Sequence, residues 1–421
     1  MTDEQGPDVA VSGKPAAVPA VGGRRRLTRV GLLTIAAVLS AYLVLGHVVA
    51  VLPVHWVMPL LRNAITQSAV LLLGAVRDAA GSWNMVLAVV AIGLALAALR
   101  RSDRGRRLAG TVAAAAATGL VLSVTTTVVL MCAANNAVGA WVLFAPAVPF
   151  GVVGDAPDET VTYATIEGST VQADLYLPAP GGAPAPLVVS IHGGAFIGGS
   201  RGTNAYTTWL AENGYAVLDV DYRLSDEANH RWDTQDADIG CALTFATAHA
   251  QQYNLDSSRV ATFGSSAGGN LAINVANKIN AGTLRPSCGT ADQLPRVRAA
   301  MALYPVVDLA ASGTETALGV DTAARHLGGP PAQYPDRYTA ADSAPHITDK
   351  SPPTLLVQGA SDHLVLADHT AAFAAALTAT GIPNRYVELP FLDHAFGSTE
   401  LDVGARVTRG LALTWLQEYL P

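Results

Sequence analysis

The sequence predicts an α/β domain built on a mainly parallel sheet and preceded by an all-α transmembrane region of about three helices. Two observations support this division. Charged residues make up only 14% of the chain, against roughly 25% in an ordinary soluble domain, and the deficit falls in the first third. From about residue 158, short apolar runs bounded by turns alternate with helical stretches, which is the pattern of a parallel sheet covered on both faces.

The chain is expected to begin with a disordered tail over residues 1–26, because this segment is rich in Pro, Gly, Ala and Val and shows no periodicity. An uncharged apolar run over 32–52 follows, which is long enough as a helix to cross about 30 Å of hydrocarbon. A cleavable signal peptide is the alternative. The run is long for that role, no A-x-A cleavage site follows it, and further apolar segments do.

Two more spans are expected within the transmembrane region 27–135, over residues 83–99 and 108–134. Five arginines lie between them in residues 100–107. Such a cluster could bind nucleic acid or anionic lipid, but a cytoplasmic loop that follows the positive-inside rule is the favoured interpretation. The net charge of −7 and the lack of a broad basic patch give no support to nucleic-acid binding.

The arginine clusters also predict which side of the membrane the second part of the chain occupies. If both clusters are cytoplasmic, three spans place the catalytic domain outside the cell membrane. The segment 64–76, flanked by Arg62 and Arg77, has a short apolar core and is expected to be an interfacial or re-entrant helix. If it spans instead, there are four helices and the domain faces inward. A linker is expected over 136–157, followed by the domain 158–421.

Seven strands are expected in this domain. Each is a short apolar or alternating run that ends at a turn, and the runs are 171–177, 187–192, 215–221, 260–263, 299–304, 354–358 and 385–389.

A G-x-S-x-G sequence centred on Ser266 follows one of these strands and precedes a helix-forming run. A sharp strand-to-helix turn needs small residues around its central Ser, because the strained backbone leaves no room for side chains. The turn presents the Ser266 hydroxyl at a helix N-terminus, where free N–H groups favour developing negative charge. The pattern alone can occur by chance in a chain with 39 glycines. The residues elsewhere in the chain therefore decide whether Ser266 is a nucleophile.

A nucleophilic serine needs a base, and the base needs an orienting carboxylate. Asp362 follows the strand 354–358, and His394 follows the strand 385–389. Both therefore lie at the same edge of the sheet as Ser266, where such sheets keep their active sites. His363 and His369 are expected to be surface residues that come too early in the chain to act as the base.

Asp393 could compete with Asp362, but as the neighbour of His394 it would not readily reach the imidazole.

An oxyanion hole is expected beside Ser266. Gly193 and Gly194 follow a buried strand and let backbone N–H groups turn toward a bound carbonyl oxygen. The N–H of Ala267, next to the nucleophile, would complete the set. Each such donor is worth roughly 3–4 kcal/mol of barrier.

Six motifs in order carry a resemblance to a known family: His192–Phe196, Asp221–Leu224, Gly264–Gly269, Tyr304–Leu309, Pro352–Val357 and Asp393–Phe396. Together they resemble the hormone-sensitive-lipase-like esterases of the α/β-hydrolase fold, over roughly residues 160–421. The resemblance implies a serine carboxylesterase with Ser266, Asp362 and His394 as its triad. It also implies Gly194, Ala195 and Ala267 as oxyanion donors, and a structural role for residues 221–224.

The chain departs from that family in two places. The third glycine of the usual H-G-G-G is Ala195 here, which keeps the N–H but narrows the site and disfavours bulky alcohols. Membrane helices and a linker stand in place of the N-terminal cap helices, and residues 310–350 are expected to supply a small cap. Cys241 and Cys288 could form a disulfide in an oxidising compartment or remain two buried thiols, since the sequence does not give their separation.

The sequence therefore predicts a multi-pass cell-membrane protein with an extracytoplasmic serine esterase domain that acts on small-molecule or lipid esters. No metal or organic cofactor is implied, and the oligomeric state is not readable. An acyltransferase or amidase with the same triad is one alternative. A catalytically silent hydrolase fold that serves as a membrane receptor is another, and the complete set of Ser266, Asp362 and His394 argues against it.

Overall fold

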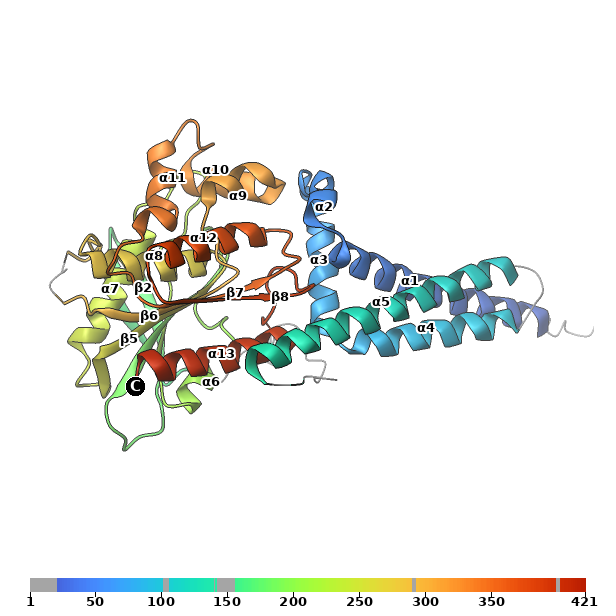
Figure 1. Cartoon of the computed structure of the whole chain (residues 1–421), viewed down its shortest axis with the longest axis horizontal. Helices are drawn as coiled ribbons and strands as arrows, with labels where there is room; N and C mark the ends of the chain where they lie inside the picture. Colours follow the sequence, from blue (N-terminus) through green and yellow to red (C-terminus); the bar gives the residue numbers. More distant parts are fainter. Residues whose placement is uncertain (1–20, 101–105, 140, 142–155, 290–292, 399–401) are drawn as a thin grey trace, which may run out of the picture.

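A computed structural model of the chain describes residues 21–100, 106–139, 141, 156–289, 293–398 and 402–421 (Figure 1). A slender bundle of helices joins a wider α/β part that holds the sheet. Most of the expected linker 136–157 lies outside the described residues. So do residues 1–20 of the expected tail and residues 101–105 of the arginine-rich loop.

Three helices pack lengthwise in the bundle: α1 (Val21–Val51), α4 (Trp83–Leu99) and α5 (Arg106–Val138) (Figure 1). By length and composition, residues 29–51 and 106–138 could each cross a membrane. The helices α3 (Ala64–Ala80) and α4 pass the same test only as a pair, which is bent by 99°.

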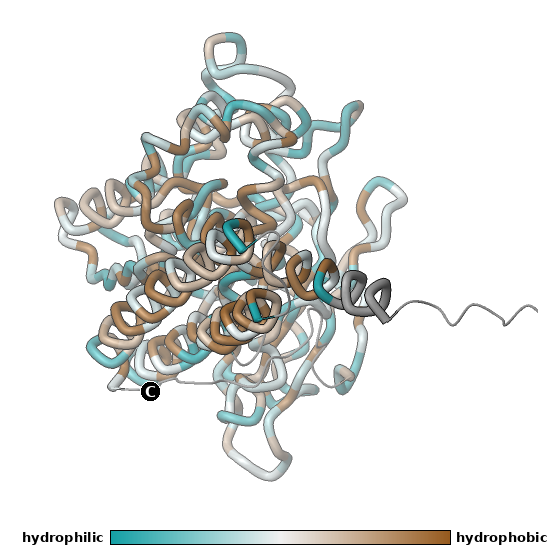
Figure 2. The backbone as a smooth tube through the Cα atoms, turned by 90° about the vertical axis from the view of Figure 1, so that its right-hand side faces the viewer, coloured by the Kyte–Doolittle hydropathy of each residue, from teal (hydrophilic) through white to brown (hydrophobic). Residues whose placement is uncertain are grey.

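The bundle has small residues inside and large apolar residues outside, which is the reverse of a water-soluble bundle. Its fully buried positions are largely alanines, namely Ala36, Ala88, Ala91, Ala95, Ala98, Ala109 and Ala116. Branched apolar side chains are exposed instead, among them Val38, Leu45, Val89, Val121 and Val128. Figure 2, which views the molecule from the bundle end, shows apolar residues around these helices. This arrangement suits a lipid environment.

Two helices of this region extend beyond the expected boundaries. The helix α1 begins at Val21, inside the expected tail 1–26, because the arginines that precede the apolar run are good helix formers and continue it. The helix α5 continues to Val138, past the expected span end at residue 134 and into the expected linker 136–157. A short helix, α2 (Val54–Leu61), was not expected. The segment 64–76 lies within α3, which crosses the end of the bundle next to the α/β part (Figure 1).

Eight strands form one sheet in the order β1-β2-β4-β3-β5-β6-β7-β8. Their bounds are β1 (Glu159–Ile166), β2 (Ser169–Tyr176), β3 (Ala185–Ile191), β4 (Ala216–Val220), β5 (Leu255–Ser265), β6 (Val297–Leu303), β7 (Thr354–Gly359) and β8 (Asn384–Leu389). The pairs β1–β2 and β2–β4 are antiparallel, and the rest of the sheet is parallel. The seven expected strands are confirmed, and β1 was missed.

Helices cover both faces of the sheet (Figure 1). One face carries α7 (Gln235–Ala248), α8 (Ala267–Ala281) and α12 (Ala367–Ala379). The other carries α6 (Thr207–Glu212) and α13 (Val403–Tyr419). The end of α5 joins this second layer, because its Met131 and Ala134 belong to the same buried apolar cluster as Phe263 and Trp415.

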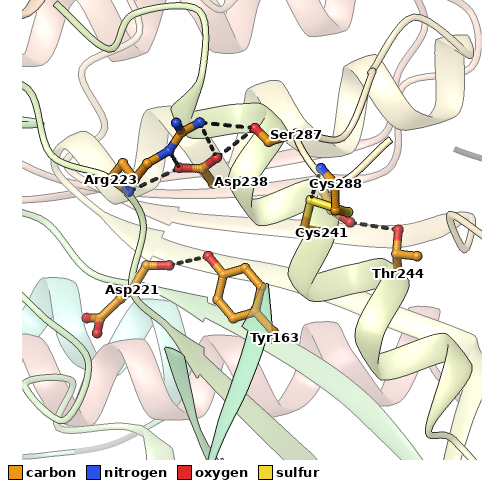
Figure 3. Close-up of a disulfide and its surroundings, with 9 residues drawn as sticks. Tyr163, Asp221, Arg223, Asp238, Cys241, Thr244, Ser287 and Cys288 are labelled. Atoms are coloured by element: carbon orange, nitrogen blue, oxygen red, sulfur yellow. Dashed lines mark hydrogen bonds and ion pairs between the residues drawn. A yellow bond between two sulfur atoms is a disulfide. The ribbon is translucent and has the colours of Figure 1, made fainter. Parts of the chain in front are cut away.

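A disulfide joins Cys241 on α7 to Cys288, which follows α8, with their Cα atoms 5.8 Å apart (Figure 3). The sequence alone leaves this pairing open. Beside it, the Arg223 guanidinium donates to both carboxylate oxygens of the buried Asp238. The neighbouring Tyr222 hydroxyl donates to the carbonyl of His192 at 2.9 Å. Residues 221–224 therefore brace the loop after β3, as the resemblance implied.

Candidate active site

The turn between β5 and α8 holds Ser266 in a strained backbone conformation with a positive φ, at φ 56° and ψ −122°. Such strain in a residue other than glycine concentrates at functional sites. The flanking glycines allow the turn. A Cβ on Gly264 would lie 2.1 Å from the carbonyl oxygen of Gly268, and a Cβ on Gly268 would lie 2.2 Å from that of Ile191. The close approach of these backbones is the physical reason for the G-x-S-x-G sequence.

The loops after β7 and β8 bring two further side chains to Ser266. The His394 Nε2 lies 3.0 Å from the Ser266 Oγ, and the His394 Nδ1 lies 2.9 Å from the Asp362 Oδ2. The Asp362 side chain is fully buried, and the His394 side chain is only 10% exposed. The structure thus brings together an alcohol, an imidazole and a carboxylate in the order that the sequence predicted.

Protein donors surround the Asp362 carboxylate. Its Oδ1 accepts hydrogen bonds from the backbone N–H groups of Leu364 and Val365, at 2.9 and 2.8 Å. Its Oδ2 accepts one from the Gln358 amide at 3.1 Å, in addition to the contact with His394. These bonds fix the orientation of the carboxylate and offset the cost of burying it.

The expectation that His363 is a surface residue is wrong. Its side chain is fully buried, and its Nδ1 lies 2.7 Å from the Asp393 Oδ2. Asp393 therefore pairs with His363, and its contact with His394 is to the backbone N–H. The expectation also fails for His369, which is largely buried on α12 and lies 3.1 Å from a carboxylate oxygen of Glu315. Tertiary packing that the local sequence does not reveal covers both imidazoles.

The expected oxyanion residues surround Ser266. Gly193, Gly194 and Ala195 follow β3, with φ 122° at Gly194 and 57° at Ala195. A Cβ on Gly193 would lie 3.4 Å from the Ser266 Cβ, so this loop packs directly against the nucleophile turn. Ala267 opens α8 beside Ser266.

Aromatic stacking holds the loop after β3. The His192 ring stacks on Tyr222, with ring centroids 4.3 Å apart, and the Phe196 ring stacks on His326 at 4.2 Å. Burial lowers the pKa of His192 and lowers that of His326 to about 3. Both imidazoles are therefore neutral near pH 7, and the buried stacks carry no uncompensated charge.

A cavity of about 440 Å³, which includes space open to solvent, lies against Ser266 and Ala195. Its other walls are mostly apolar. Val306, Leu364 and Val365 lie on loops after strands of the sheet. Phe196 follows Ala195 in the loop after β3, and the remaining residues lie on α9 (Leu309–Glu315) or α10 (Ala317–Leu327), as Leu309, Ser312, Gly313, Gly319, Thr322 and Ala323. With α11 (Pro335–Ala341), these helices form the cap expected from residues 310–350 (Figure 1).

No set of three or more His, Cys, Asp or Glu side chains that could hold a metal ion occurs within the part of the chain that the structure describes.

Comparisons with known proteins agree on an esterase-like domain. A sequence-family profile described as BD-FAE matches residues 173–377. The esterase LipC of Mycobacterium tuberculosis is 28% identical over 218 residues, which cover 51% of this chain and 53% of LipC. LipM of the same organism, a probable carboxylic ester hydrolase, is 30% identical over 217 residues, which cover 50% of this chain and 49% of LipM. The chain thus spans about half the length of these curated relatives.

Among solved structures, a bacterial heroin esterase superposes with a TM-score of 0.52 over 62% of this chain and 84% of its own, at 24% identity. This likeness and the sheet order show that residues from about 159 onward adopt the α/β-hydrolase fold. The named relatives support a serine ester hydrolase.

Proposed function

We propose that the chain is a membrane-anchored serine carboxylesterase that cleaves carboxylic esters through an acyl-enzyme on Ser266. The observation that carries the proposal is the continuous contact from the Ser266 Oγ through His394 to the buried Asp362, at 3.0 and 2.9 Å. The esterase names of its sequence relatives point to the same chemistry.

In the first half-reaction, the Ser266 Oγ attacks the ester carbonyl while the His394 Nε2 takes the hydroxyl proton. Asp362 holds the imidazole in the tautomer that presents a free Nε2 and stabilises the imidazolium that forms. The carbonyl oxygen gains negative charge and accepts hydrogen bonds from the N–H groups of Gly194, Ala195 and Ala267. The C–O bond to the alcohol then breaks, and His394 returns the proton to the departing oxygen.

In the second half-reaction, water replaces the alcohol. His394 takes a proton from the water, and the hydroxide attacks the acyl carbon. The bond to Ser266 breaks, the serine recovers its proton from His394, and the carboxylic acid leaves. The mostly apolar walls of the cavity beside Ser266 favour the uncharged ester over the charged acid product, which helps the product to leave.

Membrane anchoring rests on the two long apolar helices and on the small residues packed inside the bundle. We place the domain on the extracytoplasmic side, because arginine clusters favour the cytoplasm and a disulfide such as Cys241–Cys288 persists in oxidising compartments. Protease treatment of intact cells tests the orientation. Cleavage of the domain is the expected result, and full protection would reverse the assigned sides.

A fluorophosphonate probe, which labels activated serines, tests the reaction. The purified full chain should be labelled and should hydrolyse p-nitrophenyl esters, whereas Ser266→Ala should lose both properties. Adding an alcohol to the assay separates hydrolysis from acyl transfer, since only a transferase makes the new ester as its main product. An unlabelled wild-type protein with no hydrolysis would refute the proposal.

A further inference from the structure

Three polar side chains on α3 are buried against the α/β part. Gln67 is completely buried, Arg77 is 4% exposed, and the side chain of Asp78 is 10% exposed. Burying polar and charged groups is costly unless they find partners. The location of those partners therefore indicates what these residues do.

Each of the three side chains has a partner in the two loops that carry Asp362 and His394. Further partners are the backbone N–H of Leu318 for Gln67, the carbonyl of Gly46 for Arg77, and the ion pair between Arg77 and Asp78. The Gln67 amide donates to the carbonyl of His363 at 3.0 Å. On the other loop, the Arg77 guanidinium donates to the carbonyl of Phe391 at 2.5 Å, and the Asp78 Oδ2 accepts from the backbone N–H of Asp393 at 2.8 Å. Each loop residue lies within three positions of Asp362 or His394.

Asp393 connects the two loops to each other. Its Oδ1 accepts from the backbone N–H groups of His363 and His394, at 3.0 and 2.7 Å. Its Oδ2 lies 2.7 Å from the His363 Nδ1. A displacement of Asp393 would therefore move the backbone of His394 and of the residue next to Asp362 together.

The helix approaches Asp393 closely because position 74 carries no side chain. A Cβ on Gly74 would lie 2.1 Å from the Asp393 Oδ2 and 2.8 Å from the Asp393 Cβ. By contrast, a Cβ on Gly93 of the neighbouring helix α4 would meet nothing within 4 Å. The two glycines therefore form a matched pair for substitution.

We propose that α3 is a positioning element of the active site. Through Asp78, Arg77 and Gln67 it fixes the loops that hold Asp362 and His394, so ester hydrolysis depends on a helix of the membrane region. This inference rests on the proposed esterase function. A misplacement of about 1 Å in a catalytic group can cost about 100-fold in rate. The hydrogen bonds from α3 fix the backbone of the His394 loop, so a shift of α3 would move His394.

The test measures kcat, KM and the rate of fluorophosphonate labelling for the full chain purified in detergent. Gly74→Ala should lower kcat and the labelling rate by about 10- to 100-fold with little change in KM, while Gly93→Ala should match the wild type. Asp78→Ala should behave as Gly74→Ala does. Asp78→Asn should recover only part of the rate, because its amide oxygen can accept from the Asp393 N–H while its NH₂ group then faces the Arg77 donors that the Asp78 Oδ1 now binds.

The rate of labelling per folded molecule separates positioning from a loss of stability. A variant that is merely less stable yields less folded protein, but each folded molecule reacts at the wild-type rate. Equal rates for Gly74→Ala and Gly93→Ala would overturn the inference. If Gly74→Ala does not fold, Asp78→Ala decides, and a labelling rate per folded molecule equal to that of the wild type would overturn the inference. A wild-type protein without labelling would instead refute the esterase function itself.

Discussion

The role assigned to Asp362 predicts the effect of a single-atom exchange, Asp362→Asn. The Oδ1 position faces two backbone N–H groups that cannot reorient, from Leu364 and Val365. The new NH₂ group must therefore occupy the Oδ2 position, where it faces the His394 Nδ1. The new NH₂ group also faces the NH₂ group of Gln358. The Gln358 amide does not turn round to accept a hydrogen bond here, because its oxygen already accepts one from the Thr370 hydroxyl at 2.9 Å.

A donor at this position reverses the tautomer of His394. The Nδ1 must then accept a hydrogen bond, the proton moves to Nε2, and Nε2 can no longer take the proton of Ser266. The expected loss is about 10⁴-fold in kcat, which equals about 5.4 kcal/mol of barrier at 1.36 kcal/mol per tenfold. Hydrolysis of p-nitrophenyl acetate measures it, and the exposed Asp321 on α10 supplies the control, because Asp321→Asn should retain wild-type rates.

A comparison with the neighbouring carboxylate, Asp393, shows which result would refute the role of Asp362. If Asp362→Asn stays within about tenfold of the wild type while Asp393→Asn loses the larger factor, the hydrogen-bond argument is wrong and Asp393 orients the base.

Three further predictions address stability and specificity. Reducing the Cys241–Cys288 bond, which closes a 47-residue separation, should destabilise the α/β part by about 4 kcal/mol, as measured by thermal unfolding with and without reductant. Burial raises the pKa of Asp219 to about 7. This raised pKa contributes stability that is full below about pH 4 and is lost as the pH rises through about 7. Asp219→Asn should flatten that part of a plot of unfolding free energy against pH, and an unchanged slope would contradict the assignment. Ala195→Gly should raise kcat/KM for esters of bulky alcohols relative to ethyl esters, and an unchanged ratio would show that the Ala195 methyl does not limit the site.

Much of the fold follows from local patterns, because buried parallel strands are continuous apolar runs that end at turns. Strand β1 was missed although its sequence, Glu159–Ile166, alternates and is rich in the β-branched and aromatic residues that favour strands; it pairs antiparallel with β2 at the sheet edge. The disulfide depended on a Cα separation that no sequence pattern contains.

The sequence placed Ser266, Asp362 and His394 because each follows a strand at the same edge of the sheet. It misassigned His363 because the residues that cover it come from elsewhere in the chain. The carbonyl of His363 accepts from Gln67, which lies 296 positions earlier. Adjacent charges at Arg77 and Asp78 within an apolar stretch were the available signal, since such residues near a membrane are costly and often functional.

The continuity of α5 has a consequence for how substrate reaches the enzyme. This helix is 33 residues long, about 50 Å at 1.5 Å per residue, whereas the hydrocarbon layer is about 30 Å thick. Its last turns are part of the hydrolase core, and the Arg385 side chain on β8 donates to the carbonyl of Ala137. If α5 crosses the bilayer, this packing holds Ser266 at a fixed distance from the lipid surface. Esters held at that distance would be hydrolysed in preference to those dissolved further out.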